Sequence, residues 1–426
     1  MATTQAASFA CAQWDIEESH TTASLRGIHN VGGGVAWASG TNGTVLRTED
    51  GGYLWQTCTI PPGAEKLDFR GVQAFDENTA IVMSSGPGDQ SRLYKTTDGC
   101  QSWKLVFTNP DAGGFWDTLR ITDARTAYLL GDPVDGKFAM FFTDDGGDNW
   151  FIASDPGRGA SPGDGAFAAS NSALTSSGPF LFFGTGSSAG TTTLPHVYST
   201  RAKCVPPPDK PKAPPLTCTI EWTRAEVPMA AAGATSGLFS LAARMSPTKS
   251  GVSKITLVAV GGTYDKPEQA SDTAATSEDG GNTWTACKAP PHGYRSSVAY
   301  DPTQKLWITV GPNGTDISTD DGKNWRPLTP SSTDPADADK NWNALSLPSW
   351  LVRMDVLVAC ALSIKRQRLQ RNRSPPQLRF PAQHRSRKVL LWLLWWSRRG
   401  CAASLCAGRR RRSESRTRRR AKSGAG

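Results

Sequence analysis

The sequence predicts an all-β fold, a propeller of seven four-stranded blades, and two observations support this prediction. A short motif, Ser/Thr-x-Asp-x-Gly-x-x-Trp, recurs along the chain together with apolar runs that end in glycine. The composition agrees, because 42 glycines, 29 prolines and 15 tryptophans in 426 residues suit many short strands joined by tight turns. A unit that recurs every few tens of residues is typical of closed repeat folds.

The motif, known as the Asp-box, is complete in four copies, at residues 48–55, 143–150, 277–284 and 318–325. A fifth copy has Cys100 where glycine is expected, and a degraded sixth opens at Ser199 and reaches Trp222 only after a proline-rich insertion. Asp and Ser/Thr side chains accept hydrogen bonds from nearby main-chain N–H groups, while Trp covers the hairpin with an apolar ring. We therefore expect structural roles for Asp50, Trp55, Asp98, Trp103, Asp145, Trp150, Asp279, Trp284, Asp320 and Trp325.

Each motif copy lies within the same predicted order of four strands. In the first repeat the strands are residues 25–28, 35–40, 44–47 and 55–60. Trp14 opens a fourth strand that no first three precede, so we expect it to complete a last blade whose innermost strand is 341–347. Sharing one blade between the chain ends removes the exposed edges of the sheet. The periodicity stops after Pro348, which predicts that this last blade is incomplete.

Charge divides the chain into unlike parts. Residues 349–426 hold 18 Arg and 3 Lys against two carboxylates, whereas residues 1–348 carry a net charge of −10. We expect residues 13–348 to be the propeller and residues 349–426 to be a disordered basic tail, with a frameshifted reading of the gene as the leading explanation. A genuine tail that binds anionic lipid or nucleic acid is the alternative. The acidic body itself gives no reason to expect nucleic acid as a partner.

The N-terminal residues and two cysteines suggest the cellular compartment in which the protein is found. Residues 10–12, Ala-Cys-Ala, have the small-x-small form of a signal-peptidase site, so residues 1–12 are interpreted as the remnant of a signal peptide or as disordered. Cys204 and Cys218 flank the proline-rich stretch, where a disulfide would suit an oxidising compartment; two unrelated thiols are the alternative. We therefore expect a periplasmic or secreted monomer. The longest apolar run near the end, 389–396, falls short of the roughly 20 residues of a membrane span.

A resemblance to known propellers rests on residues 34–48, Gly-Val-Ala-Trp-Ala-Ser-Gly followed by Thr-Asn-Gly-Thr-Val-Leu-Arg-Thr and the first Asp-box. This run resembles the repeat of the photosystem II assembly-factor propellers, and the likeness covers about residues 13–348. Asp-boxes are also shared with sialidases, sortilin-type receptors and xyloglucanases. The resemblance implies a non-catalytic scaffold that holds a protein partner and needs no cofactor or metal.

One group of residues is a candidate for partner binding. Arg26, Arg70 and Arg295 are placed in one register at the start of an innermost strand, and Asp117 takes that place in the third blade. Such positions should surround one mouth of the central channel, where charges reinforce each other's field. Ordinary solvated charges at the rim are the alternative.

The competing function is a secreted glycoside hydrolase of the sialidase or xyloglucanase type, with a carbohydrate as ligand. Asp117 and Asp164 are its candidate carboxylates, because glycoside hydrolysis needs two carboxyl groups about 5–10 Å apart. Neither the Arg-Ile-Pro motif of sialidases nor a Cys-x-x-Cys or histidine pair for a metal occurs in the sequence, so no catalytic or metal-binding residue is assigned.

Overall fold

The computed structural model describes residues 14–153, 157–186, 193–205, 217–248, 253–347, 350–353 and 356–359, all within the first of the two units into which the chain divides, Met1–Arg366. These residues form β-strands, with one short 3-10 helix, η1 (Gly88–Gln90). None of them belongs to a helix that could cross a membrane. The predicted all-β propeller is confirmed.

Six four-stranded blades are each built from one continuous stretch of chain, with every strand paired antiparallel to the next. In chain order these blades contain the following strands. Blade 1 has β2 (Leu25–Gly32), β3 (Val35–Gly40), β4 (Val45–Thr48) and β5 (Gln56–Thr57), and blade 2 has β6 (Phe69–Ala74), β7 (Ala80–Ser84), β8 (Arg92–Thr96) and β9 (Lys104–Thr108). Blade 3 has β10 (Trp116–Ile121), β11 (Ala127–Val134), β12 (Lys137–Thr143) and β13 (Phe151–Ile152), and blade 4 has β14 (Leu174–Ser177), β15 (Phe180–Gly184), β16 (His196–Val205) and β17 (Thr217–Glu226). Blade 5 has β18 (Ser236–Ser246), β19 (Lys254–Thr263), β20 (Ala274–Ser277) and β21 (Thr285–Ala286), and blade 6 has β22 (Ser297–Asp301), β23 (Leu306–Gly311), β24 (Gly314–Ser318) and β25 (Arg326–Pro327).

A further four-stranded sheet joins the two ends of the propeller. Its order is β1 (Asp15–Glu18), β28 (Val356–Ala359), β27 (Trp350–Arg353) and β26 (Trp342–Ser346). The rings of Trp14 and Trp342 stack here with centroids 6.2 Å apart. This composite sheet extends past Pro348, where the sequence pattern stops. The predicted count of seven blades, with the last shared between the chain ends and incomplete, is not confirmed, because six blades are continuous and the side chains of β27 and β28 lie outside the described residues.

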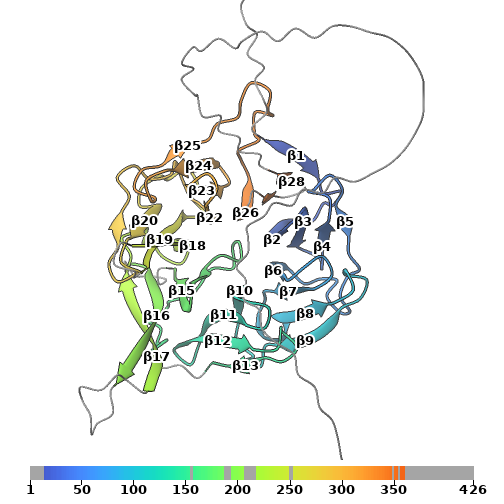
Figure 1. The fold of residues 1–426 in the computed structure, drawn as a ribbon, viewed down its shortest axis with the longest axis horizontal. Coiled ribbons are helices and arrows are strands. Elements are labelled where there is room, and N and C mark those ends of the chain that lie inside the picture. The colour runs from blue at the N-terminus through green and yellow to red at the C-terminus, as the bar shows by residue number, and fades with distance from the viewer. Residues whose placement is uncertain are drawn as a thin grey trace, which may run out of the picture. The chain divides into compact units, whose positions relative to one another are not determined.

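The blades follow one another around a common centre (Figure 1). Each innermost strand contacts the innermost strands of the blades before and after it, and β26 contacts both β22 and β2. The apolar core lies between blades rather than within one: Trp37 of blade 1 packs with Phe69 and Val82 of blade 2. Since a four-stranded sheet has two faces, each blade buries one face against each neighbour.

The Asp-box turns explain why the same hairpin recurs. In the first copy Thr48 Oγ1 donates to Asp50 Oδ1 at 2.8 Å and accepts from the Gly52 N–H at 3.1 Å. Gly52 has φ of 96°, a left-handed conformation that favours glycine. The equivalent hydrogen bonds recur in the copies that begin at Thr96, Thr143, Ser277 and Ser318. The predicted structural aspartates therefore hold turns closed.

Candidate functional site

A repeated backbone irregularity positions the candidate site. In five innermost strands the pairing register shifts by one residue near the strand start, which leaves one extra residue in a β-bulge. A bulge re-aims the side chain of the extra residue, and such bulges are common beside functional sites. The extra residues are Arg26, Arg70, Asp117, Phe239 and Asn343.

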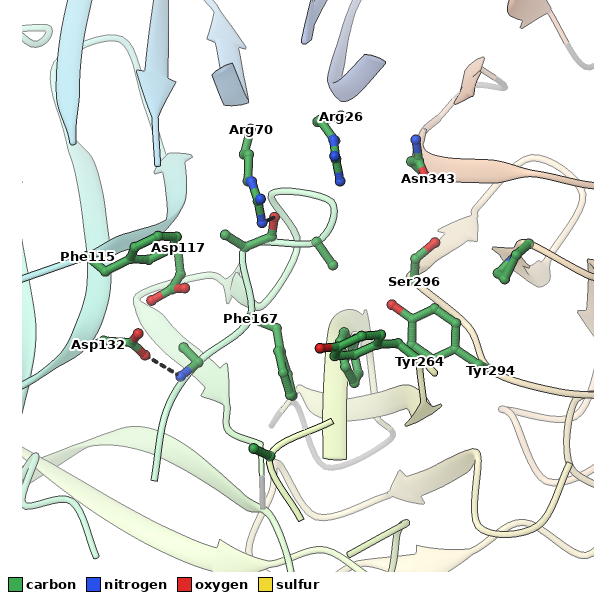
Figure 2. Close-up of a pocket in the computed structure, with 16 residues that line it drawn as sticks. Arg26, Arg70, Phe115, Asp117, Asp132, Phe167, Tyr264, Tyr294, Ser296 and Asn343 are labelled. Carbon is green, nitrogen blue, oxygen red and sulfur yellow. Dashed lines mark hydrogen bonds between the residues drawn. The ribbon is translucent and has the colours of Figure 1, made fainter. Parts of the chain in front are cut away.

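All five bulge residues line one cavity of about 580 Å³, which we call the mouth cavity. Figure 2 shows Arg26 and Arg70 on one side of it, Asp117 and Asp132 beside Phe115, and Phe167, Tyr264 and Tyr294 on the other side. The structure thus brings together three of the four residues proposed from the sequence. The site is assembled from different sheets, because the five bulged innermost strands present their extra residues to the same cavity.

The two arginines of the mouth cavity share one carboxylate. Arg70 Nε donates to Asp68 Oδ2 at 2.8 Å, and Arg26 Nε lies 4.0 Å from Asp68 Oδ1. Both guanidinium groups are partly exposed, at about a third of their side-chain surface. Burial lowers the pKa of Arg26, an effect that Asp68 opposes and Arg70 reinforces. One acid therefore leaves part of the positive charge of two arginines available to a ligand.

Two acidic groups face the arginines. Burial raises the pKa of Asp117 well above its ordinary value, a neighbouring charge on Asp132 raises it further, and Arg70 opposes the change. Burial also raises the pKa of Asp132, whose Oδ1 accepts the Ala166 N–H at 2.9 Å. A protonated Asp117 adds no negative charge beside Arg70, and it can donate a hydrogen bond.

An aromatic wall completes the mouth cavity. Phe167 stacks on Phe239 with centroids 3.6 Å apart, and Tyr294 packs edge-on against Phe239 at 4.8 Å. Tyr264 also contacts Phe239 edge-on and is half-exposed. Sequence reasoning missed this wall. One signal was present, since Arg26, Arg70 and Phe239 each precede a small residue, and at Gly27 an added side chain would meet the main chain of β6.

Arg295 does not belong to this group, and its predicted placement is wrong. Ser297 pairs with Val310 without a register shift, and the residues on either side of Arg295, Tyr294 and Ser296, line the mouth cavity. A displacement of one residue along a strand sends the side chain to the opposite face. The Arg295 side chain is fully buried.

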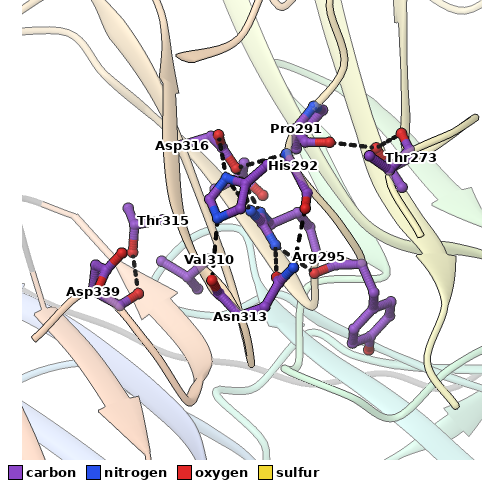
Figure 3. A network of polar contacts seen from close by, with 12 residues as sticks. Thr273, Pro291, His292, Arg295, Val310, Asn313, Thr315, Asp316 and Asp339 are labelled. Atoms are coloured by element: carbon purple, nitrogen blue, oxygen red, sulfur yellow. Dashed lines mark hydrogen bonds and ion pairs between the residues drawn. The ribbon is translucent and has the colours of Figure 1, made fainter. Parts of the chain in front are cut away.

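Arg295 instead forms an internal network, shown in Figure 3. Its Nε donates to Asp316 Oδ2 at 2.9 Å, and its Nη1 donates to Asn313 Oδ1 at 2.5 Å. His292 Nδ1 lies 2.8 Å from Asp316 Oδ1, and this hydrogen bond raises the pKa of His292. The network satisfies the buried charge, so Arg295 has a structural role.

The two carboxylates considered for a glycoside hydrolase do not line one cavity. Asp117 lines the mouth cavity, whereas Asp164 lines a neighbouring hollow that shares Asp132 with it, and Asp164 lies 3.9 Å from His196 Nδ1. Within the described ranges no group of three His, Cys, Asp or Glu side chains could hold a metal ion.

The cysteines give an unexpected result. Cys58, just after β5 of blade 1, forms a disulfide with Cys100 in the Asp-box turn of blade 2. The proposed Cys204–Cys218 bridge falls on residues whose side chains lie outside the described residues. Their backbones are direct partners across β16 and β17.

Comparison with known proteins agrees with the predicted resemblance. Residues 6–182 match the sequence profile of the photosynthesis system II assembly factor YCF48 family. This match spans blades 1 to 3 and includes Arg26, Arg70 and Asp117. The matched family is described as an assembly factor, which agrees with the expectation of a scaffold rather than an enzyme. No curated protein sequence matches the chain.

One solved structure supports the propeller fold, and two others give weaker matches. A YCF48 bound to a D1 peptide is 18% identical, with a TM-score of 0.51, over 83% of this chain and 97% of that one. YCF48 from Cyanidioschyzon merolae is 16% identical, with a TM-score of 0.49, over 82% of this chain and 98% of that one. The GH74 enzyme of Niastella koreensis is 13% identical, with a TM-score of 0.32, over 71% of this chain and 56% of that one.

Proposed function

We propose, from the match of residues 6–182 to the YCF48 family, that this chain is a non-catalytic propeller scaffold that holds a protein partner at the mouth cavity. The observation that carries the proposal is the set of bulges, which brings two incompletely neutralised arginines and an aromatic wall from separate blades to one opening. The similar propeller that binds a D1 peptide supports a peptide segment as the ligand.

The chemistry of the cavity defines the segment. Arg26 and Arg70 favour a carboxylate, either an acidic side chain or a chain terminus, because charge-assisted hydrogen bonds to guanidinium groups are the stronger ones. Phe239 and Tyr264 favour an apolar or aromatic side chain next to that carboxylate. An extended segment of a few residues supplies both groups within about 580 Å³.

Two further features belong to the proposal. The composite sheet acts as the seventh blade, since β26 contacts both neighbouring innermost strands and Trp14 stacks on Trp342. The protein works as a monomer in a periplasmic or secreted setting. The Cys58–Cys100 disulfide supports an oxidising compartment.

The direct test is binding of a fluorescent D1 peptide to the full chain, followed by anisotropy. The double variant Arg26→Ala/Arg70→Ala should bind at least about tenfold more weakly, the effect of losing one charge-assisted hydrogen bond. The matched control Arg125→Ala removes an exposed arginine of blade 3 and should bind as the wild type does. Equal affinity of the double variant and the control would exclude the mouth cavity as the binding site.

A glycoside hydrolase remains the second candidate because Asp117 and Asp132, two acids of raised pKa, line the same cavity. Such acids can protonate a leaving group. Release of reducing sugar from xyloglucan by the wild type, lost in Asp117→Asn, would favour this candidate. No release by the wild type would reject it for this substrate.

A further inference from the structure

A second cavity lies deeper in the ring, and we call it the inner cavity. It measures about 310 Å³ and is lined by His29, Gln73 and Arg120 among others. These three residues follow the bulge residues of blades 1, 2 and 3 by three positions each. At the rise of a β-strand, about 3.3 Å per residue, the inner cavity begins about 10 Å beyond the mouth cavity.

Three side-chain acceptors at the inner cavity already accept main-chain N–H groups. His29 Nδ1 accepts the Ala74 N–H at 3.0 Å, and Gln73 Oε1 accepts the Ile121 N–H at 3.2 Å. Asn171, on the segment before β14, accepts the Leu119 N–H through Oδ1 at 2.8 Å.

These bonds fix the orientation of the three side chains. In Gln and Asn only the amide oxygen can accept a main-chain N–H, and in His only the unprotonated ring nitrogen can do so. Gln73 and Asn171 are therefore left with their amide N–H groups, and His29 is left with its Nε2–H. The structure gives none of these donors a partner among the described residues. These three side chains therefore offer donors, and no acceptor, to a ligand in the inner cavity.

Arg120 supplies a positive charge in the same place. Its guanidinium makes no hydrogen bond or ion pair with any residue that the structure describes, and its Nε is buried without a partner. The described residues that line the inner cavity include neither Asp nor Glu. Burial lowers the pKa of Arg120, while burial and the charge of Arg120 lower the pKa of His29 to about 4, so His29 is neutral at pH 7.

A partly buried cation without a counter-ion is unfavourable, and a bound anion with its hydrogen bonds compensates that cost. We infer that the inner cavity is a binding site for a small oxyanion such as phosphate or sulfate, held by Arg120 and by the N–H groups of His29, Gln73 and Asn171. The bound oxyanion joins blades 1, 2 and 3 to the segment that leads into blade 4. Its binding therefore stabilises the closed ring.

The first test measures phosphate and sulfate binding to the full chain by calorimetry and by the shift in melting temperature. Sodium chloride at equal ionic strength serves as the reference. The wild type should bind either oxyanion and melt at a higher temperature in its presence. Arg120→Gln should bind about 10- to 100-fold more weakly, as expected for losing a charge-assisted hydrogen bond.

The melting temperature of Arg120→Gln without oxyanion shows whether weaker binding could come from misfolding of the variant. Without oxyanion, Arg120→Gln should melt at or above the wild-type temperature, because it removes a partly buried positive charge that no described residue pairs with. The matched control Arg125→Gln, an exposed arginine of blade 3 that lines neither cavity, should keep wild-type oxyanion binding. The inference fails if the wild type responds no more to phosphate or sulfate than to chloride, or if Arg120→Gln responds as the wild type does.

A soaked crystal locates the ion. Crystals grown without phosphate or sulfate and soaked in selenate should show an anomalous selenium peak whose oxygens lie about 3 Å from the Arg120 guanidinium. A peak only beside Arg26 and Arg70, or no peak, overturns the assignment of the inner cavity.

Discussion

The Cys58–Cys100 disulfide makes a quantitative prediction, because it joins the outer part of blade 1 to the Asp-box turn of blade 2. Both cysteines are buried, and their sequence separation is 42. In the chain-entropy description, opening a loop of that size costs about 4 kcal/mol of folding free energy. We expect Cys58→Ala/Cys100→Ala to lose about this amount.

Backbone conformation adds a second, separable effect. Cys100 occupies the glycine position of the Asp-box with φ of 65°, a left-handed conformation that costs a side-chain-bearing residue roughly 1–2 kcal/mol. Cys58→Ala/Cys100→Gly also lacks the disulfide but relieves this strain. It should therefore be about 1 kcal/mol more stable than the double-alanine variant.

Urea unfolding of the full chain, followed by tryptophan fluorescence, measures both differences. Cys287→Ala is the control, because Cys287 is the free cysteine of the described region. If both double variants unfold at the wild-type midpoint, the disulfide does not stabilise the ring. If alanine and glycine at position 100 give equal stability, the strain argument is wrong.

Three further variants test other parts of the account. Trp150→Ala should lower the free energy of unfolding by about 3–5 kcal/mol, whereas Tyr53→Ala, in an exposed turn, should change it little. Arg295→Met should cost about 3–5 kcal/mol, because it leaves Asp316 buried without its main partner. Burial raises the folded-state pKa of Asp117 above its ordinary value of 3.8. Between the ordinary pKa and the raised pKa, the folded chain keeps a proton that the unfolded chain has released. The free energy of unfolding therefore falls as pH rises between these two values. Asp117→Asn should reduce the fall in melting temperature from about pH 4 to about pH 8, and an unchanged fall would show that Asp117 does not titrate abnormally.

The repeat could be predicted from the sequence because its determinants are local. Thr48, Asp50 and Gly52 make their turn within five residues, so spacing alone predicts the hairpin. The join between the chain ends was also predictable, since Trp14 opens an unaccompanied fourth strand. Strands β27 and β28 were missed, although the apolar stretches 350–352 and 356–359 were visible in the sequence.

The site was only partly predictable because it depends on bulges. Arg26 and Arg295 look equivalent in the sequence, yet a one-residue difference in register sends one to the mouth cavity and buries the other. A bulge leaves no residue-type signature strong enough to fix that register. The Cys58–Cys100 pairing and the donors around Arg120 arise from contacts between blades, which no single repeat encodes.

Photocrosslinking tests the central claim, that the partner segment lies in the mouth cavity, most directly. A D1 peptide carrying a photoreactive group is bound to the full chain, irradiated, and the attachment sites are mapped by mass spectrometry. The account predicts attachment to the aromatic wall, at Phe239, Tyr264 or Tyr294. Attachment to the exposed outer strand of blade 3, at Phe151 or Ile152, with none at the aromatic wall, would contradict it.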